Sequence, residues 1–318
     1  MRELEQLLGR ERGDIKRIAS FAGRFYHQLD MSTTKPGRVL KWRHLDVSEG
    51  ELRSMQRRIQ TRILRPLTFP PTMLGAIPGR SIRLNAAVHL RQPLVVTLDI
   101  KNFFPTSRFD VVYRRFCEEL QCSPDIAHLL TQLTTFRRRI PQGAPTSSAV
   151  ANLVALPLHD ALQRIALERG LCCTIWVDDI AISGDGVLDG IEDVIEAIHR
   201  FGYAIARKKL KIQGASNSQS VTGVVVNDKP SAGRNRLAAI RAEIHVLANG
   251  AVVPSWQLER VQGLIGAVEQ VCGSQARPLR RLAEQLNDRA VTIASRPRSG
   301  EWLECQGGRH CRARTLRA

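Results

Sequence analysis

The sequence lacks the long apolar segments that membrane and secreted proteins carry. Its 318 residues contain no run of about eighteen apolar residues, so no transmembrane helix is predicted. The opening stretch, MRELEQLLGRERGD, mixes acidic and basic side chains and has no apolar core of the kind found in signal peptides. We therefore expect a cytoplasmic protein that makes no contact with a membrane.

Paired cysteines are also missing. The seven cysteines are odd in number and form no C-x-x-C spacing, which argues against a disulfide framework. Cys305, His310 and Cys311 could supply part of a zinc site, but no fourth ligand is evident. Free thiols in a reducing compartment are the expectation.

Acidic residues are scarce relative to basic ones. Lys and Arg total 47 against 30 Asp and Glu, which gives a formal net charge of +17. An excess of this size favours a polyanionic partner, nucleic acid first, with a generally basic protein of no specific partner as the alternative. Arginine outnumbers lysine, which suits bidentate contacts with phosphate. The charge predicts a class of partner and not a chemistry.

The hydrophobic pattern divides the chain into four regions. With 43% hydrophobic residues, the chain can bury a sizeable core. The regions are an N-terminal helical extension (1–34), a mixture of helices and strands (35–229), a small helical domain (230–295) and a basic tail (296–318).

Local signals predict several elements inside the mixed region. Alternating basic residues indicate a strand over 38–42, and the unbroken apolar run LVVTLDI indicates a buried strand over 94–100. Ser48 and Glu51 have the spacing of a capping box, which predicts the start of a helix. In the helical domain, apolar residues at helical spacing predict three amphipathic helices between 237 and 286.

Two adjacent carboxylates interrupt the stretch TIWVDDIAISG (174–184). Alternating β-branched residues on either side predict a β-hairpin with Asp178 and Asp179 at its tip. Like charges side by side repel unless a cation lies near them, and Mg²⁺ prefers carboxylate oxygen. Ordinary turn chemistry is the alternative explanation of an Asp-Asp pair.

Asp99 ends the apolar strand over 94–100, where a strand meets solvent. It could meet the Asp178 pair on a neighbouring strand. Two metal ions held about 3.5–4 Å apart by such acids stabilise the attacking and leaving oxygens of phosphoryl transfer. Taken alone, Asp99 is better explained as a cap at the end of a strand.

Four segments, in this order, resemble the palm of a reverse transcriptase: VTLDIKNFF, IPQGAPTSSAVANL, WVDD and GYAIARKKLK. The resemblance covers roughly residues 35–270. It implies an α+β fold with the right-hand architecture of polymerases. Fingers and a palm, whose antiparallel sheet packs on helices, would occupy 35–229, and a small helical thumb would occupy 230–295.

Further segments are similar to those of bacterial retron reverse transcriptases. They are NAAVH (85–89), VTG (221–223), the thumb-like LERVQGLIGAVEQV (258–271), and KPGRV with MQRRI in the fingers. Such enzymes copy part of their own structured non-coding RNA into a branched RNA–DNA hybrid, msDNA. The chain departs from the family at Trp176, where Tyr is usual, and at Ala206, where Asn is common.

The resemblance implies roles in the chemical step. Asp99, Asp178 and Asp179 would be the catalytic acids, binding two Mg²⁺ ions with help from the Ile100 carbonyl; Mn²⁺ can substitute in such sites. Lys209 would protonate pyrophosphate as general acid, with Lys208, or a role in binding phosphate only, as alternatives.

Binding roles also follow from the resemblance. Arg38 would contact the triphosphate of a dNTP, Phe104 would reject a ribose 2′-hydroxyl, and Gln142 and Gly143 would touch the nucleotide. Core packing is the alternative for Phe104. Trp176 would stack under the primer end. The residues expected to recognise RNA are Asn85, His89, Val221, Thr222 and Gly223, with a buried structural role as the alternative for His89.

Partners and competing functions complete the expectations. The template and primer would be the cognate non-coding RNA, and a separate toxic effector protein would join the enzyme in anti-phage defence. Two alternatives remain: another bacterial reverse transcriptase, of the group II intron or abortive-infection type, and a catalytically silent RNA-binding scaffold.

Overall fold

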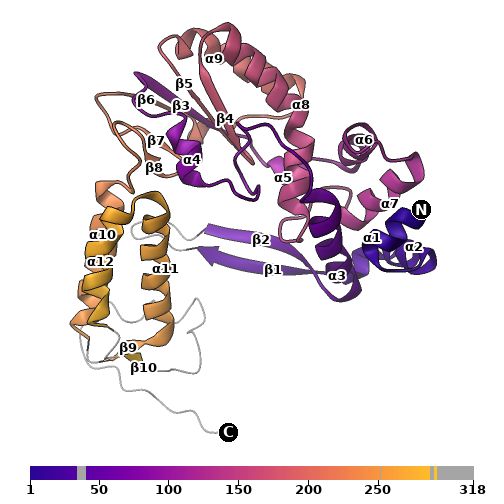
Figure 1. The fold of residues 1–318 in the computed structure, drawn as a ribbon, viewed down its shortest axis with the longest axis horizontal. Coiled ribbons are helices and arrows are strands. Elements are labelled where there is room, and N and C mark those ends of the chain that lie inside the picture. The colour runs from indigo at the N-terminus through magenta and orange to yellow at the C-terminus, as the bar shows by residue number, and fades with distance from the viewer. Residues whose placement is uncertain (34–40, 251, 287–289, 292–318) are drawn as a thin grey trace. The chain divides into compact units, whose positions relative to one another are not determined.

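The computed structural model describes residues 1–33, 41–250, 252–286 and 290–291 (Figure 1). Helices α1 (Arg2–Leu8) and α2 (Arg12–Ser20) begin the chain and bury their apolar faces. A short 3-10 helix, η1 (Ala22–Phe25), leads into strand β1 (Tyr26–Thr33), which pairs with β2 (Lys41–Ser48) in a two-stranded sheet. The expected helical extension is therefore helical only to Phe25, because β1 completes a hairpin with β2. The predicted strand over 38–42 begins instead at Lys41, and 34–40 lie outside the described residues.

Helix α3 (Gly50–Ile59) follows β2 and continues into a π-helical segment, η2 (Gln60–Leu64). The predicted capping box is wrong, because the N-cap is Glu49 and no side chain caps the helix. Ser48 instead ends β2, and its hydroxyl donates to Gln56 Oε1 at 2.6 Å in the interior. A buried amide that needs a partner has taken the hydroxyl that the motif assigned to the helix end.

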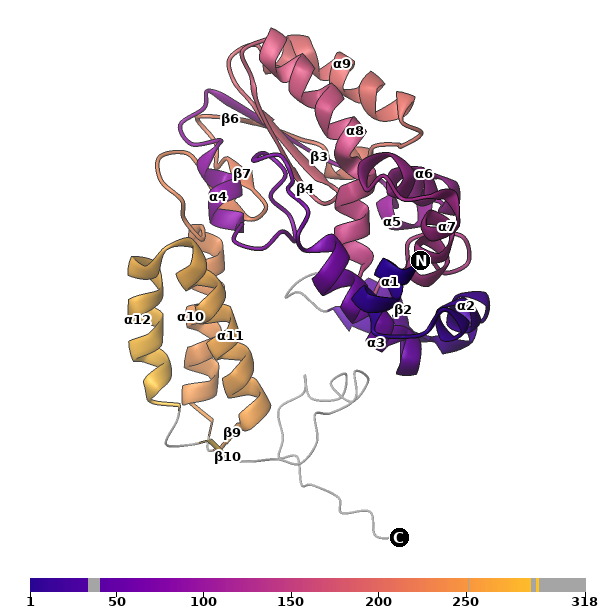
Figure 2. The same ribbon diagram turned by 45° about the vertical axis from the view of Figure 1, so that its right-hand side comes forward.

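The chain divides into two compact units, and the first comprises Met1–Met31, Trp42–Gly233 and Gln270–Cys272. A four-stranded sheet lies at the centre of this first unit. Its order is β4 (Cys172–Trp176), β5 (Asp179–Ser183), β3 (Leu94–Asp99) and β6 (Lys211–Gly214), and all neighbours are antiparallel. The long helix α8 (Ser147–Glu168) and α9 (Val187–Arg200) pack on one face (Figures 1 and 2). This antiparallel sheet on helices confirms the predicted α+β class.

Smaller elements cover the opposite face of the sheet. Helix α4 (Ile82–Ala87) packs on the short strands β7 (Ser220–Val221) and β8 (Val224–Val225). Val95 of β3 and Ala181 of β5 share a buried cluster with residues of these elements. The two faces of the sheet are thus both buried, which explains the continuous apolar runs of its strands.

Three helices lie between β3 and α8 in the chain. They are α5 (Phe103–Thr106), α6 (Phe109–Glu119) and α7 (Pro124–Thr134), with α6 and α7 side by side in both views. Sequence reasoning missed α7, although Ser123 followed by Pro124 is a common helix start. A short 3-10 helix, η3 (Arg207–Lys209), precedes β6.

The second unit consists mainly of three helices. The predicted amphipathic segments correspond to α10 (Arg234–Ala248), α11 (Ser255–Val271) and α12 (Gly273–Glu284). Two short strands, β9 (Val253–Pro254) and β10 (Ala290–Val291), pair in parallel. In the described part of the chain, no helix combines the length and the apolarity that crossing a bilayer requires.

Candidate active site

The sheet register brings the three predicted acids together. Asp99, the last residue of β3, lies directly opposite Asp179, the first residue of β5. Asp178 occupies the turn between β4 and β5, and its carbonyl accepts a hydrogen bond from the Ile100 backbone N–H at 2.9 Å. The predicted hairpin is therefore present. Asp99 and Asp178, 79 positions apart in the chain, have their carboxylates at the same end of the sheet.

The segment Thr72–Gly75, which the sequence did not indicate as part of the site, supports the hairpin along its outer strand, β4. The Leu74 N–H donates to the Ile175 carbonyl at 2.8 Å, and the Ile175 N–H donates to the Thr72 carbonyl at 2.9 Å. Gly75 lies so close beneath the turn that a Cβ there would be 2.6 Å from the Val177 nitrogen. Asn152 of α8 donates to the Gly75 carbonyl at 2.8 Å. The close approach of two backbones explains why glycine occupies this position.

The acids repel one another and are partly compensated by a lysine. Burial, and then the Asp99 charge, raise the pKa of Asp178. The pKa of Asp179 is raised to about 6 by burial of its carboxyl and by the charges of Asp178 and Asp99, although the residue as a whole is exposed. Lys209 Nζ forms an ion pair with Asp99 Oδ2. Concentrated negative charge at the end of buried strands is a feature of functional sites.

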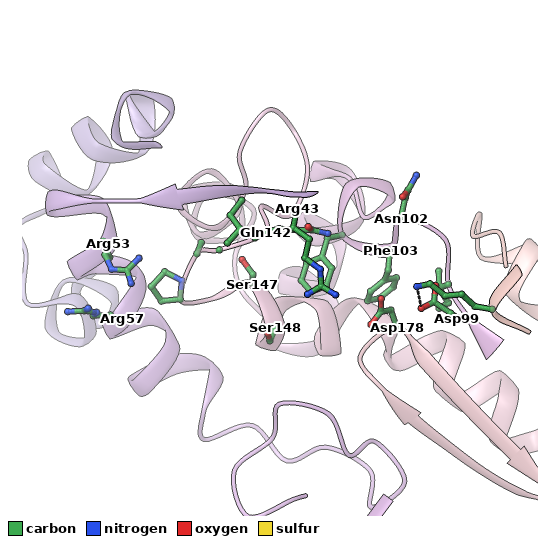
Figure 3. A pocket seen from close by; sticks show the side chains of 17 residues that line it. Arg43, Arg53, Arg57, Asp99, Asn102, Phe103, Gln142, Ser147, Ser148 and Asp178 are labelled. Carbon is green, nitrogen blue, oxygen red and sulfur yellow. Dashed lines mark hydrogen bonds and ion pairs between the residues drawn. The ribbon is translucent and has the colours of Figure 1, made fainter. Parts of the chain in front are cut away.

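A cavity of about 660 Å³ opens beside the acids (Figure 3). Seven of the predicted site residues line it: Asp99, Ile100, Phe104, Gln142, Gly143, Asp178 and Lys209. The Asp46 N–H donates to the Gln142 carbonyl at 2.7 Å, which fixes the P-Q-G segment to β2. Gly143 has φ +124, and a Cβ there would be 3.1 Å from the Asp46 carbonyl oxygen, so glycine permits this contact.

Three arginines in the cavity were missed as site residues. Arg43 of β2 and Arg53 and Arg57 of α3 line it with Asn102, Ser147 and Ser148. In Figure 3, Asp99 and Asp178 lie at one end, Arg53 and Arg57 lie at the other, and Arg43 lies between them. The alternating basic residues at the start of β2 and the MQRRI segment (55–59) are the sequence features that pointed to basic side chains here. Arg38, the predicted triphosphate ligand, lies outside the described residues.

The two adjacent phenylalanines take different positions. Phe103 is 1% exposed, and its ring centroid lies 5.2 Å from that of Tyr203. Phe104 is only half-buried beside the cavity. Phe103 therefore does the core packing, which leaves the Phe104 ring available to a bound molecule.

His89 does not face solvent. It is fully buried, and its Nδ1 and Nε2 lie 2.7 Å from Ser183 Oγ and 2.8 Å from Thr174 Oγ1. Burial lowers the pKa of His89 to about 4, so the ring is neutral. Both ring nitrogens link β4 and β5, which favours the structural alternative for His89, and its role in RNA recognition stays a prediction.

The other residues expected to recognise RNA differ in their exposure. Asn85 and Val221 are buried, and Asn85 Nδ2 donates to Thr222 Oγ1 at 3.3 Å. Neither the Asn85 nor the Val221 side chain reaches the surface, and their role in RNA recognition stays a prediction. Thr222 and Gly223 form the β7–β8 turn with positive φ values. Trp176 is half-buried at the end of β4.

The donor set at the acids suits a hard cation. Within the described part of the chain, no three or more Asp, Glu, His or Cys side chains are arranged so that together they could hold a metal ion as they stand. Burial and the charges of neighbouring carboxylates raise the pKa values of Asp178 and Asp179. The Lys209 ammonium group compensates part of this negative charge through its ion pair with Asp99. Divalent cations with oxygen ligands fit such a site.

The fold and the site define a polymerase class that comparison with known proteins identifies. The chain matches the family described as "Reverse transcriptase (RNA-dependent DNA polymerase)" over residues 33–226. The chain belongs to the reverse transcriptase family. A telomerase from Candida albicans, solved with the TWJ fragment of telomeric RNA, has the same fold. Its TM-score is 0.50 at 9% identity, over 89% of this chain and 60% of that one.

Curated relatives narrow the likeness. The chain is 31% identical over 261 residues to the Retron Mx65 reverse transcriptase of Myxococcus xanthus, covering 75% of this chain and 60% of the relative. It is 32% identical over 232 residues to the Retron Se72 enzyme of Salmonella heidelberg (70% and 60%). It is 29% identical over 265 residues to the Retron Ec86 enzyme of Escherichia coli (82% and 80%). The predicted resemblance to retron reverse transcriptases is confirmed, and the chain spans 60% of the length of the first two relatives.

Proposed function

We propose that the protein is an RNA-directed DNA polymerase of a retron. The observation that carries this is the convergence of Asp99 and Asp178 on one cavity whose other end is lined by arginines. Negative charge at one end suits metal ions, and positive charge at the other suits a nucleotide triphosphate. The charged and polar lining of the cavity fits a charged substrate rather than an apolar one. Family membership supports the same activity.

The acids would hold the catalytic cations. Asp99 and Asp178, with the Ile100 carbonyl and Asp179, would bind two Mg²⁺ ions, with Mn²⁺ as a substitute. Bound there, these ions supply Lewis-acid stabilisation of the attacking and leaving oxygens. Lys209 would donate a proton to the departing pyrophosphate, since its ammonium group lies beside Asp99 at the cavity that the acids line. Without a cation the same ammonium group limits the repulsion between the carboxylates.

The remaining lining would select the nucleotide. Arg43 is the described residue best placed between the acids and α3 to contact a triphosphate, beside the role proposed for Arg38. Phe104, half-buried at the lining of the cavity, would exclude a 2′-hydroxyl. Gln142 and Gly143 bring backbone and amide groups to the same nucleotide, and Trp176 would stack under the primer end.

The retron assignment extends the proposal to partners. Residues 35–229 would form fingers and palm, 230–295 the thumb, and 296–318 a basic tail. The template is then a structured non-coding RNA, the product is branched msDNA, and a separate effector protein completes a defence system. The relatives support this class, since each is a retron reverse transcriptase. Thr222 and Gly223 remain candidates for RNA contact.

Primer extension tests the activity directly. Purified protein, dNTPs, Mg²⁺ and an RNA template should yield DNA, whereas Asp178→Asn should abolish synthesis and keep RNA binding. A catalytically silent scaffold would make no DNA in either form. Nucleic acid copurified from cells with the native locus distinguishes retron function. After RNase treatment, a discrete DNase-sensitive band should remain with the wild type only. A template-independent DNA ladder, or no band, would contradict the retron assignment.

A further inference from the structure

A two-residue hairpin at the end of α7 presents arginines in a conformation that arginine rarely adopts. Phe136 and Arg139 exchange both backbone hydrogen bonds, at 2.8 and 3.1 Å. Between them Arg137 and Arg138 have φ values of +49 and +58. Turns of this type favour Asn-Gly, because L side chains are strained at positive φ. Arginines at both positions therefore do not serve the stability of the turn.

The two arginines have no acidic partner in the described part of the chain. Arg139 reaches Asp46 at 3.7 Å, and Arg108, on the neighbouring segment, lies 3.9 Å from Asp110. Arg137 and Arg138 are exposed, and each guanidinium lies over an aromatic ring. Because acids do not neutralise them, their charges are available to a phosphate group.

Aromatic rings alternate with these charges. The Arg138 guanidinium carbon lies 4.9 Å from the centre of the Phe109 ring, and that ring lies 5.5 Å, edge-on, from the exposed His128 ring of α7. Arg137 lies 5.0 Å from the Phe136 ring. Planar guanidinium and aromatic groups offer stacking surfaces for unpaired bases, while the charges bind the backbone, which is the chemistry of single-stranded nucleic acid recognition.

The hairpin also lies near the cavity along the chain. Gln142, which lines the cavity, is four positions after Arg138 in the chain, so the two lie within about 14 Å of each other. The Phe109 N–H donates to the Arg138 carbonyl at 3.0 Å, and the Ile140 N–H donates to the Ser107 carbonyl at 3.1 Å. These bonds fix the turn to the segment that precedes α6, which holds the arginines at a defined place beside the site.

We propose that the Phe136–Arg139 hairpin, with Phe109 and His128, is a binding surface for single-stranded RNA. Arg137 and Arg138 contact phosphates, and the Phe109 and His128 rings stack on unpaired bases. The Phe136 ring stacks on Tyr26 at 4.3 Å and supports Arg137 from below. The inference rests on the proposed function, which makes RNA the template. It adds a place on the protein where template outside the primer duplex is held.

The test uses the double variant R137N/R138G, which installs the residues that this turn prefers. Binding of a labelled, unstructured RNA of about twenty nucleotides is measured by fluorescence anisotropy at several salt concentrations, without dNTPs or Mg²⁺. We expect about tenfold weaker binding, and a slope of log K against log salt smaller by about 1.4, from two lost contacts with a single strand. The melting temperature should stay the same or rise, because the strain at positive φ is relieved.

Two matched variants make the result specific. R164Q/R200Q removes the same charge from exposed positions on α8 and α9 and should leave the salt slope unchanged. R137K/R138K keeps both charges and should keep the slope. The proposal is overturned if R137N/R138G binds RNA as the wild type does, if R164Q/R200Q loses as much, or if only a DNA strand of the same length is affected. Primer extension by the wild type is scored separately, so failure of the proposed function is recognised independently.

Discussion

Lys209 and Asp99 form an ion pair across the edge of the cavity, although 110 residues separate them in the chain. Antiparallel pairing of β3 with β6 creates this proximity, since η3 delivers Lys209 just before β6 begins. The lysine thus balances a carboxylate that would also bind metal. Under the proposed function, its ammonium group would donate a proton to the departing pyrophosphate.

Replacing Lys209 should separate its role from that of its neighbour. Lys209→Met is expected to slow DNA synthesis by about 100-fold, because a proton donor is lost. Lys208→Met is the matched control, since Lys208 is exposed and lies next in the chain. Single-turnover primer extension measures both. Equal losses in the two variants would show that general basic charge matters here and that no single proton donor operates.

The acids should make the metal-free protein less stable at neutral pH. The folded-state pKa of Asp179 is about 6, above its ordinary value of 3.8, so folding favours the neutral carboxyl. The stabilisation is fully present below about pH 4 and is lost as the pH rises through about 6. Asp179→Asn should therefore raise the melting temperature at pH 8 in EDTA. Solvent screening keeps the gain below about 1 kcal/mol.

The control for this effect is the same substitution outside the cluster. Asp185→Asn, at an exposed position, should leave the melting temperature at pH 8 in EDTA unchanged. Adding Mg²⁺ should stabilise the wild type more than Asp179→Asn, because the cation compensates the charge that the variant lacks. A wild type that does not respond to Mg²⁺ would contradict the metal assignment.

Gly75 should be intolerant of any side chain. Gly75→Ala would place a methyl group 2.6 Å from the Val177 backbone nitrogen, so the turn that carries Asp178 must shift. We expect a loss of about 1–3 kcal/mol in the free energy of unfolding and a lower rate of primer extension. Gly13→Ala is the control, because nothing lies within 4 Å of a Cβ at Gly13. Urea denaturation and extension assays measure the two effects, and an unchanged rate would mean that the turn position is not critical.

His89 should make stability depend on pH without affecting RNA affinity. Its folded pKa is about 4, below the ordinary 6.5, so the unfolded chain binds the proton more tightly. Stability from this group is present above pH 6.5 and is lost as the pH falls towards 4. His89→Phe should flatten this dependence and cost about 1–3 kcal/mol, because the hydroxyls of Thr174 and Ser183 lose their partner. His199→Phe, at an exposed site, should do neither.

The acids could be predicted because their signals are local. A charge that ends an apolar strand, and a pair that interrupts alternating β-branched residues, both mark positions where a sheet meets solvent. The arginines of the cavity could not be found in this way, because Arg43 and Arg53 come to line the same cavity as the acids only through the folding of β2 and α3. His89 illustrates the opposite case, since a polar side chain in a motif gives no sign of whether it is buried.

The predicted capping box failed for a related reason. Ser48 satisfied a local rule, but the buried Gln56 amide offered its hydroxyl a partner in the interior. Helix α7 was not predicted, although Pro124 at its start and its apolar spacing are ordinary helix signals. The sequence alone was therefore sufficient to predict this helix.

The pairing of Thr72–Leu74 with β4 has a consequence for how the molecule behaves in solution. An uncovered edge strand presents free N–H and C=O groups to which another chain can add as a strand. Here the protein's own backbone occupies that edge at Ile175. At the opposite edge β6 is only four residues long and begins with the exposed Lys211. Both borders of the sheet are therefore poor templates for the addition of a strand from another chain.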